Sequence, residues 1–132
     1  MKVLDASALL AYLGNELGAE VVEAALAEGG AVMHTVNWAE VLTKRAERGD
    51  DPAHLEAVLT QSGLIQQLLV IDPGQPEDAV QVAAFRMSTR SAGLSLGDRY
   101  CLALGARLGA PVLTADRAWG SLAIGVQIDL IR

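Results

Sequence analysis

The sequence is poor in the residues that build thiolate metal sites, disulfide scaffolds and membrane spans. Cys101 is the only cysteine among 132 residues, which excludes an internal disulfide and a zinc site made of thiolates. It lies in an apolar helical pattern, so we expect a buried, inert thiol. No apolar run approaches the roughly 20 residues that cross a bilayer. Because residues 1–2 lead straight into an apolar segment rather than a basic and apolar leader, we expect a cytoplasmic protein.

Histidine and positive charge are also scarce. The two histidines, His34 and His54, are far apart and lack a ligand-like spacing, so neither is assigned to a metal. Ten lysines and arginines stand against sixteen acidic residues, a formal net charge of −6, which excludes a protein that holds nucleic acid by bulk charge alone. A metal bound at an acidic site would reverse the local sign of the charge, so a nuclease remains compatible with this composition.

Aromatic residues make up only 4% of the chain and hydrophobic residues 52%, so alanine, leucine and valine must build the core. A chain of 132 residues is long enough for one domain with a real core. Two segments of helical pattern have more apolar positions than one core face needs: Leu9, Leu10, Tyr12, Leu13, Val21 and Val22. We therefore expect part of this surface to form a groove for a segment of a partner protein.

Short apolar runs alternate with segments of helical spacing along the chain. The runs predict strands at residues 3–4, 31–34, 68–71, 111–114 and 126–131. The helical spacing predicts helices that begin near residues 6, 16, 38, 52, 77 and 95, and one helical turn at residues 116–119. This order predicts an α/β fold with a central, mainly parallel β-sheet and helices on both faces.

Two of these segments carry predictions about burial. The run at 68–71 is uninterrupted, which is typical of a strand covered on both faces. The helix predicted over residues 77–91 should turn its apolar side chains inward: Val80, Val82, Ala83, Ala84 and Met87.

Four carboxylates recur at equivalent places, each just after a predicted strand or in the first turn of a helix: Asp5, Glu40, Asp98 and Asp116. Helix capping explains each one separately. Asp5 or Ser7 would cap the first helix, residues 37–40 and 95–98 match capping boxes, and Asp116 would cap its short helix. Capping does not explain why the acids recur at the sheet edge where α/β proteins bind ligands. Clustered carboxylates repel one another unless a cation or proton intervenes, and oxygen ligands suit Mg²⁺ or Mn²⁺.

Four segments that contain these acids resemble the PIN domain of the VapC-type toxin ribonucleases of type II toxin–antitoxin systems. They are residues 3–10 (VLDASALL), 37–41 (NWAEV), 96–106 (LGDRYCLALGA) and 112–119 (VLTADRAW). In this order and spacing they span nearly the whole chain, so the resemblance implies a single PIN domain over residues 1–132.

The resemblance also implies a function. It implies a Mg²⁺-dependent endoribonuclease specific for single-stranded RNA, with Mn²⁺ as an alternative ion, in which a water activated by the metal cleaves RNA and leaves a 5′-phosphate. Asp5, Glu40, Asp98 and Asp116 would be the catalytic metal ligands, and Ser7 and Thr114 would be supporting hydroxyls. The toxin would form a homodimer, act on single-stranded or structured RNA, and be neutralised by a cognate VapB-type antitoxin. The arginines near the acids are candidate RNA contacts: Arg86, Arg90, Arg99 and Arg117.

Two other classes of protein remain open. A haloacid-dehalogenase-like phosphohydrolase also has an aspartate after its first strand. It needs a second aspartate two residues later, where this chain has Ser7, and a lysine in the later core, whereas the only lysines are Lys2 and Lys44. The second alternative is a non-catalytic binding module with an acidic pocket, in which the acids are helix caps. A metal titration separates this module from the enzyme.

Overall fold

The structure, a computed structural model that describes residues 1–132, has a five-stranded sheet at its centre. All neighbouring strands are parallel, in the order β3-β2-β1-β4-β5. The strands are β1 Lys2–Leu4, β2 Ala31–His34, β3 Leu69–Asp72, β4 Val112–Thr114 and β5 Ile128–Leu130. The predicted α/β class is confirmed, and the predicted strands are found with small changes at their ends.

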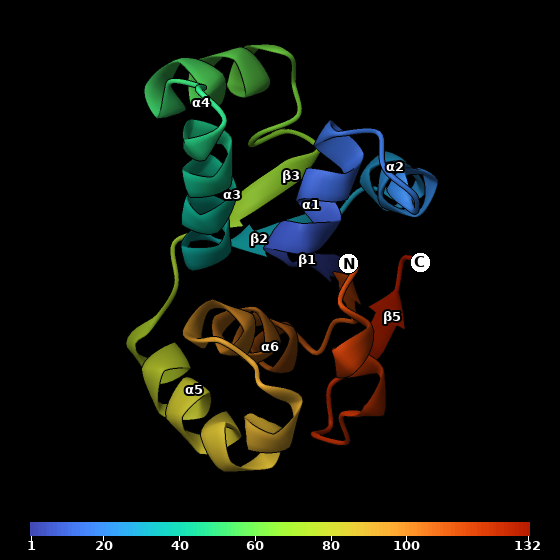
Figure 1. The fold of residues 1–132 in the computed structure, drawn as a ribbon, viewed down its shortest axis with the longest axis vertical. Helices are drawn as coiled ribbons and strands as arrows, with labels where there is room; N and C mark the ends of the chain where they lie inside the picture. The colour runs from blue at the N-terminus through green and yellow to red at the C-terminus, as the bar shows by residue number, and fades with distance from the viewer.

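Helices cover both faces of this sheet (Figure 1). They are α1 Ala6–Leu13, α2 Ala19–Glu28, α3 Thr35–Glu47, α4 Pro52–Gln61, α5 Pro76–Thr89 and α6 Leu96–Leu108, with short 3₁₀ helices η1 Arg90–Ala92 and η2 Arg117–Ser121. Side chains alternate along β1, so that Leu4 packs in a core of 17 buried residues with α1 to α3, and Val3 packs in a core of 12 with α5 and α6. None of these helices is long and apolar enough to span a membrane.

The parallel register brings the carboxyl ends of the strands to one edge. Leu4 pairs with Leu113, and His34 at the end of β2 pairs with Asp72 at the end of β3. Asp5 and Thr114 therefore lie at the same edge as His34 and Asp72. In open α/β sheets this edge is the usual place for a ligand.

Two helices start at residues other than those predicted. The second helix begins at Ala19, not near residue 16, because Gly18 adopts φ +95° and a Cβ there would lie 2.6 Å from the Ile131 carbonyl oxygen. The third helix begins at Thr35, because His34 caps it by accepting a hydrogen bond from the Val36 amide at Nδ1. Asn37 is thus inside the helix, and the predicted capping box at residues 37–40 is wrong.

The burial predictions for β3 and α5 are also wrong. β3 is an edge strand, and Val70 is 45% exposed rather than covered on both faces. On α5 the buried stripe is Asp78, Val82, Phe85 and Thr89. Of the side chains expected to point inward only Val82 is buried, while the others are exposed: Val80, Ala83, Ala84 and Met87. The apolar pattern predicted the wrong inward face for α5, because two polar residues of the buried stripe have buried hydrogen-bond partners.

The apolar side chains of α1 and α2 are less available than expected. Leu9 and Val22 are fully buried in the core, so they cannot line a groove for a partner. Leu10, Tyr12, Leu13 and Val21 are partly buried against the same core. Cys101 is fully buried, as predicted, and burial first of all raises the pKa of its thiol well above the usual value.

Candidate metal centre

Asp5 is the most buried of the four predicted acids, with 4% of its surface exposed. Its Oδ1 accepts a hydrogen bond from the Ala8 amide at 2.8 Å, so it does cap α1. The same carboxylate accepts hydrogen bonds from the Ser7 hydroxyl at 2.7 Å and from the Thr114 hydroxyl at 2.6 Å. The two hydroxyls fix the carboxylate between β1 and β4, which a helix cap alone does not require.

Burial makes a negative charge on Asp5 unfavourable. The pKa of Asp5 is raised to about 6, mainly by desolvation. The hydrogen bonds from Thr114, Ala8 and Ser7 act against this rise, and the negative charge of Asp98 adds to it. Burial likewise raises the pKa of Glu40, its hydrogen bond from Asn37 lowers it, and Asp98 again raises it. Asp98 is therefore within electrostatic reach of both other acids.

The same three acids surround Cys101 on α6. After burial, the charges of Asp5, Asp98 and Glu40 raise the pKa of its thiol. The Glu40 carboxylate lies against Gly97, the neighbour of Asp98, but the ligand atoms of the three acids do not all lie within 4.8 Å of one another. They come from the end of β1, from the second turn of α3 and from the first turn of α6.

Asp98 is also a helix cap. The predicted capping box is present, because the Ser95 amide donates to the Asp98 carboxylate at 3.0 Å and the Asp98 amide donates to the Ser95 hydroxyl at 3.1 Å. Only Oδ2 of Asp98 accepts in this box, so Oδ1 has no hydrogen-bond partner within the protein. Capping and binding of a cation therefore do not exclude each other at this residue.

Asp116 is placed differently from the other three acids. Its side chain is exposed and caps η2 by accepting from the Ala118 amide at 3.0 Å. Its backbone joins the site, since its amide donates to the Thr114 hydroxyl at 3.0 Å while the Ala115 amide donates to the Ser7 hydroxyl at 2.9 Å. The structure places Asp5 and Glu40 within electrostatic reach of Asp98 and leaves the Asp116 side chain on a solvent-facing turn.

The chemistry of these donors fits a hard divalent cation. The three converging groups are carboxylates, and oxygen ligands are those that Mg²⁺ and Mn²⁺ prefer. The raised pKa values of Asp5 and Glu40 express a desolvation penalty and a repulsion that a cation would relieve.

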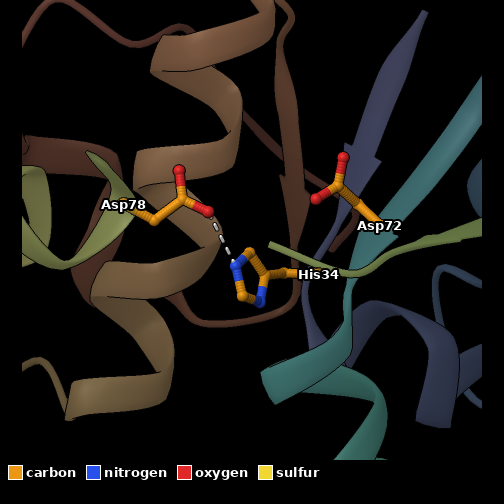
Figure 2. A group of neighbouring side chains, drawn as sticks. All are labelled: His34, Asp72 and Asp78. Carbon is orange, nitrogen blue, oxygen red and sulfur yellow. Dashed lines mark hydrogen bonds and ion pairs between the residues drawn. The ribbon is translucent and has the colours of Figure 1, made fainter. Parts of the chain in front are cut away.

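A second charged cluster, which the sequence analysis missed, lies further along the same edge. One ligand atom each of His34, Asp72 and Asp78 lies within 4.8 Å of the others, a grouping that could hold a metal ion (Figure 2). The His34 ring nitrogen Nε2 is 3.0 Å from the Asp78 carboxylate. Because Nδ1 accepts from the Val36 amide, the ring proton is assigned to Nε2, which donates to Asp78.

Arg107 already supplies a positive charge to this second cluster. Its guanidinium donates to Asp72 at 2.7 Å and to Asp78 at 2.9 Å. The hydrogen bond from Arg107 is the main cause of the lowered pKa of Asp72. Burial alone would raise the pKa of Asp78, but the hydrogen bonds from Arg107, the Gln75 amide and His34, with the Arg107 charge, together lower it. A metal would have to displace this guanidinium and the His34 proton, so the cluster acts here as an ion network that ties β2 and β3 to α5 and α6.

The arginines predicted to contact RNA differ in whether they already have a partner within the protein. The Arg99 guanidinium donates to the Val82 carbonyl at 2.9 Å and so ties α6 to α5. Arg86, Arg90 and Arg117 are exposed and form no ion pair.

A cavity of about 490 Å³ lies between η1 and η2, and three of its lining residues are serines: Ser88, Ser91 and Ser121.

Comparison with known proteins agrees with this architecture. The model of the PIN domain family matches residues 2–124. The fold is similar to that of VapBC2 from Rickettsia felis bound to a promoter DNA fragment, with a TM-score of 0.71, 10% identity, and 98% of this chain and 97% of that chain covered. It is also similar to DNA-bound VapBC from Salmonella typhimurium, with a TM-score of 0.71, 15% identity, and 99% and 98% covered.

A toxin–antitoxin complex from Klebsiella pneumoniae is a further structural neighbour, with a TM-score of 0.67, 16% identity, and 97% of this chain and 100% of that chain covered. No curated protein sequence matches the chain. At these identities the structural neighbours establish the fold alone. The family model covers nearly the whole chain, including four of the five strands, and on that ground the chain belongs to the PIN domain family.

Proposed function

We propose that this protein is a Mg²⁺-dependent endoribonuclease that cleaves single-stranded RNA and leaves a 5′-phosphate. The observation that carries the proposal is the convergence of Asp5, Glu40 and Asp98 at the carboxyl edge of the sheet, where the Asp98 charge raises the pKa of both other acids. Membership in the PIN domain family supports the nuclease class.

Asp5, Glu40 and Asp98 would hold the cation, and Asp116 would contribute from the adjoining turn. When bound, a divalent cation supplies Lewis-acid stabilisation of phosphate oxygens and makes a coordinated water more acidic. Ser7 and Thr114 fix the Asp5 carboxylate by donating to it, so its ligand oxygens are preorganised.

Exposed arginines would bind the RNA backbone. Arg86, Arg90 and Arg117 have no acidic partner, so each is free to contact a phosphate. Arg99 would act indirectly, by holding α6 against α5 through the Val82 carbonyl.

We further propose that the protein is the toxin of a toxin–antitoxin pair, forms a homodimer, and is neutralised by a VapB-type antitoxin. The structural neighbours support this, since they are VapBC and toxin–antitoxin complexes. The part of the predicted groove that remains exposed surrounds Leu13, which lines two cavities of about 350 and 400 Å³. An apolar antitoxin side chain would fit there better than at Val22, which is in the core.

The experiment that tests the activity compares the parent with Asp98→Asn on single-stranded RNA. Asparagine keeps the capping oxygen but removes the charge that would hold the metal. We expect the parent to cut RNA with Mg²⁺, to stop in EDTA, and to yield ends that a 5′-phosphate-dependent exonuclease degrades. The variant should fold and be inactive. If Asp98→Asn cuts at the parental rate, the proposed site is wrong; if the parent binds Mn²⁺ but cuts no RNA, the binding-module alternative is favoured.

A further inference from the structure

We propose that Asn37 and Gly97 form a clamp that positions the Glu40 carboxylate for the divalent cation. The clamp joins α3, which carries Asn37 and Glu40, to the first turn of α6, which carries Gly97. The inference rests on the proposed function in one respect, namely that Glu40 is a metal ligand. Neither clamp residue touches the metal in this account, so both are positioning residues.

Asn37 provides the first half of the clamp. It is 1% exposed, and its side-chain amide nitrogen Nδ2 donates both hydrogens, to Glu40 Oε1 at 2.8 Å and to the Gly97 carbonyl at 2.9 Å. Its Oδ1 is buried and has no partner. Turning the amide over would place Oδ1 against these two acceptors, so the two hydrogen bonds define one orientation of the side chain. That orientation holds Glu40 against the start of α6.

Gly97 provides the second half by leaving space. A Cβ at this position would lie 2.7 Å from the Glu40 Cδ and in still closer contact with Oε1. Its φ angle is not in the left-handed region, so the backbone of α6 does not require a glycine here. Glycine is a poorer helix former than alanine, and alanine would otherwise favour this helix. The absent side chain is therefore explained by the Glu40 carboxylate that occupies its place.

The clamp matters because a free glutamate side chain has several rotamers. Glu40 is only partly buried, and apart from Asn37 no side chain donates a hydrogen bond to it. Groups that orient a metal ligand commonly change metal affinity by about 10–100-fold when they are removed. A purely structural role for Asn37, which would be to join α3 to α6 through the Gly97 carbonyl, predicts no such change in the folded protein.

The test measures Mn²⁺ affinity by calorimetric titration of the full chain. Gly97→Ala keeps the helix but pushes the Glu40 carboxylate out of place, and Asn37→Ala removes its donor. We expect each variant to bind Mn²⁺ about 10–100-fold more weakly than the parent. Leu96→Ala, at the exposed neighbour of Gly97, is the matched control and should bind like the parent. Thermal unfolding without metal checks that every variant is folded.

A double-variant cycle with Glu40→Ala identifies the cause. Once the carboxylate is gone, the added methyl of Gly97→Ala has nothing to displace, so Gly97→Ala/Glu40→Ala should bind Mn²⁺ as Glu40→Ala alone does. The clamp is overturned if Gly97→Ala binds Mn²⁺ as tightly as the parent does. It is also overturned if the Gly97→Ala change weakens Mn²⁺ binding equally in the parent and in Glu40→Ala. If the parent itself binds no Mn²⁺, the proposed metal site fails instead. If Asn37→Ala does not fold, Gly97→Ala still decides the outcome.

Discussion

Replacing Asp5 with asparagine should stabilise the metal-free protein at neutral pH. The pKa of Asp5 in the fold is about 6, against an ordinary value of 3.8, mainly because the carboxylate is desolvated. At about 1.36 kcal/mol per pKa unit, this difference means that the ionised group destabilises the fold by about 3 kcal/mol. Asparagine removes the charge and keeps the oxygen that caps α1.

The stabilisation that Asp5→Asn brings is smaller than the free energy that the ionised Asp5 costs the fold. The Nδ2 group of an asparagine cannot accept the hydrogen bond that the Thr114 hydroxyl donates to Oδ2 at 2.6 Å. Loss of one such hydrogen bond removes about 1 kcal/mol. We therefore expect a net stabilisation of about 2 kcal/mol, which raises the melting temperature by roughly 6–10 °C for a domain of this size.

The pH dependence gives the sharper test. Folded Asp5 binds its proton more tightly than unfolded Asp5, so the parent loses stability as pH rises from about 4 to about 6 and stays at the lower level above that. Asp5→Asn lacks this titration. The difference in unfolding free energy between variant and parent should therefore be smallest near pH 4 and reach its full size above about pH 6.5.

Urea unfolding across this pH range, in EDTA, measures the difference. Asp51→Asn is the matched control, because Asp51 makes the same kind of cap at α4 but is exposed. A difference for Asp5→Asn that does not change with pH, or that changes no more than the difference for Asp51→Asn, would refute the account of Asp5 as a buried, penalised carboxylate.

Three further outcomes are expected. Millimolar Mn²⁺ or Mg²⁺ should raise the melting temperature of the parent but not that of Asp5→Asn, because the cation relieves carboxylate repulsion. If differential scanning fluorimetry shows no shift for the parent, the metal site is contradicted. Arg107→Met should lower the free energy of unfolding, measured in urea, by about 3–5 kcal/mol, because it leaves Asp78 buried without its cation. This loss should be larger at neutral than at acidic pH, where Asp72 and Asp78 become protonated. A loss independent of pH would show that packing, not charge, is responsible. Leu13→Glu should weaken binding of a cognate antitoxin in a pull-down, whereas Val58→Glu on α4 should not; equal binding by both variants would place the partner surface elsewhere.

The sequence predicted the parts of this fold that depend on local patterns. Apolar runs identified the strands, and Asp51 with Pro52 marked the start of α4 correctly. The capping box of Ser95 and Asp98 was also read correctly, because both partners lie within one helical turn. The recurrence of acids after strands indicated which edge of the sheet to examine.

Features that depend on contacts between distant residues could not be read in this way. His34 caps α3 and bonds to Asp78, 44 residues away, and Arg107 reaches Asp72 across 35 residues. A histidine at the end of a strand gives no local signal of either contact. The inward face of α5 was misjudged for the same reason, since Asp78 is buried only because distant partners neutralise it. For the candidate site, the sequence pointed to all four acids but gave no sign that the Asp116 side chain would face solvent.

The hydrogen bonds between β1 and β4 have a consequence for the order of folding. The Thr114 hydroxyl reaches Asp5 across 109 residues, and the Ala115 amide reaches Ser7 across 108. Closing a loop of this length costs more entropy than closing a short one, so these contacts depend on the docking of distant parts of the chain. Before β4 docks beside β1, Asp5 has no Thr114 to hold it, so a partly folded chain lacks the preorganised carboxylate. In the proposed nuclease, RNA cleavage would therefore require the chain through β4, and a fragment that ends before Thr114 would lack the fixed Asp5 carboxylate.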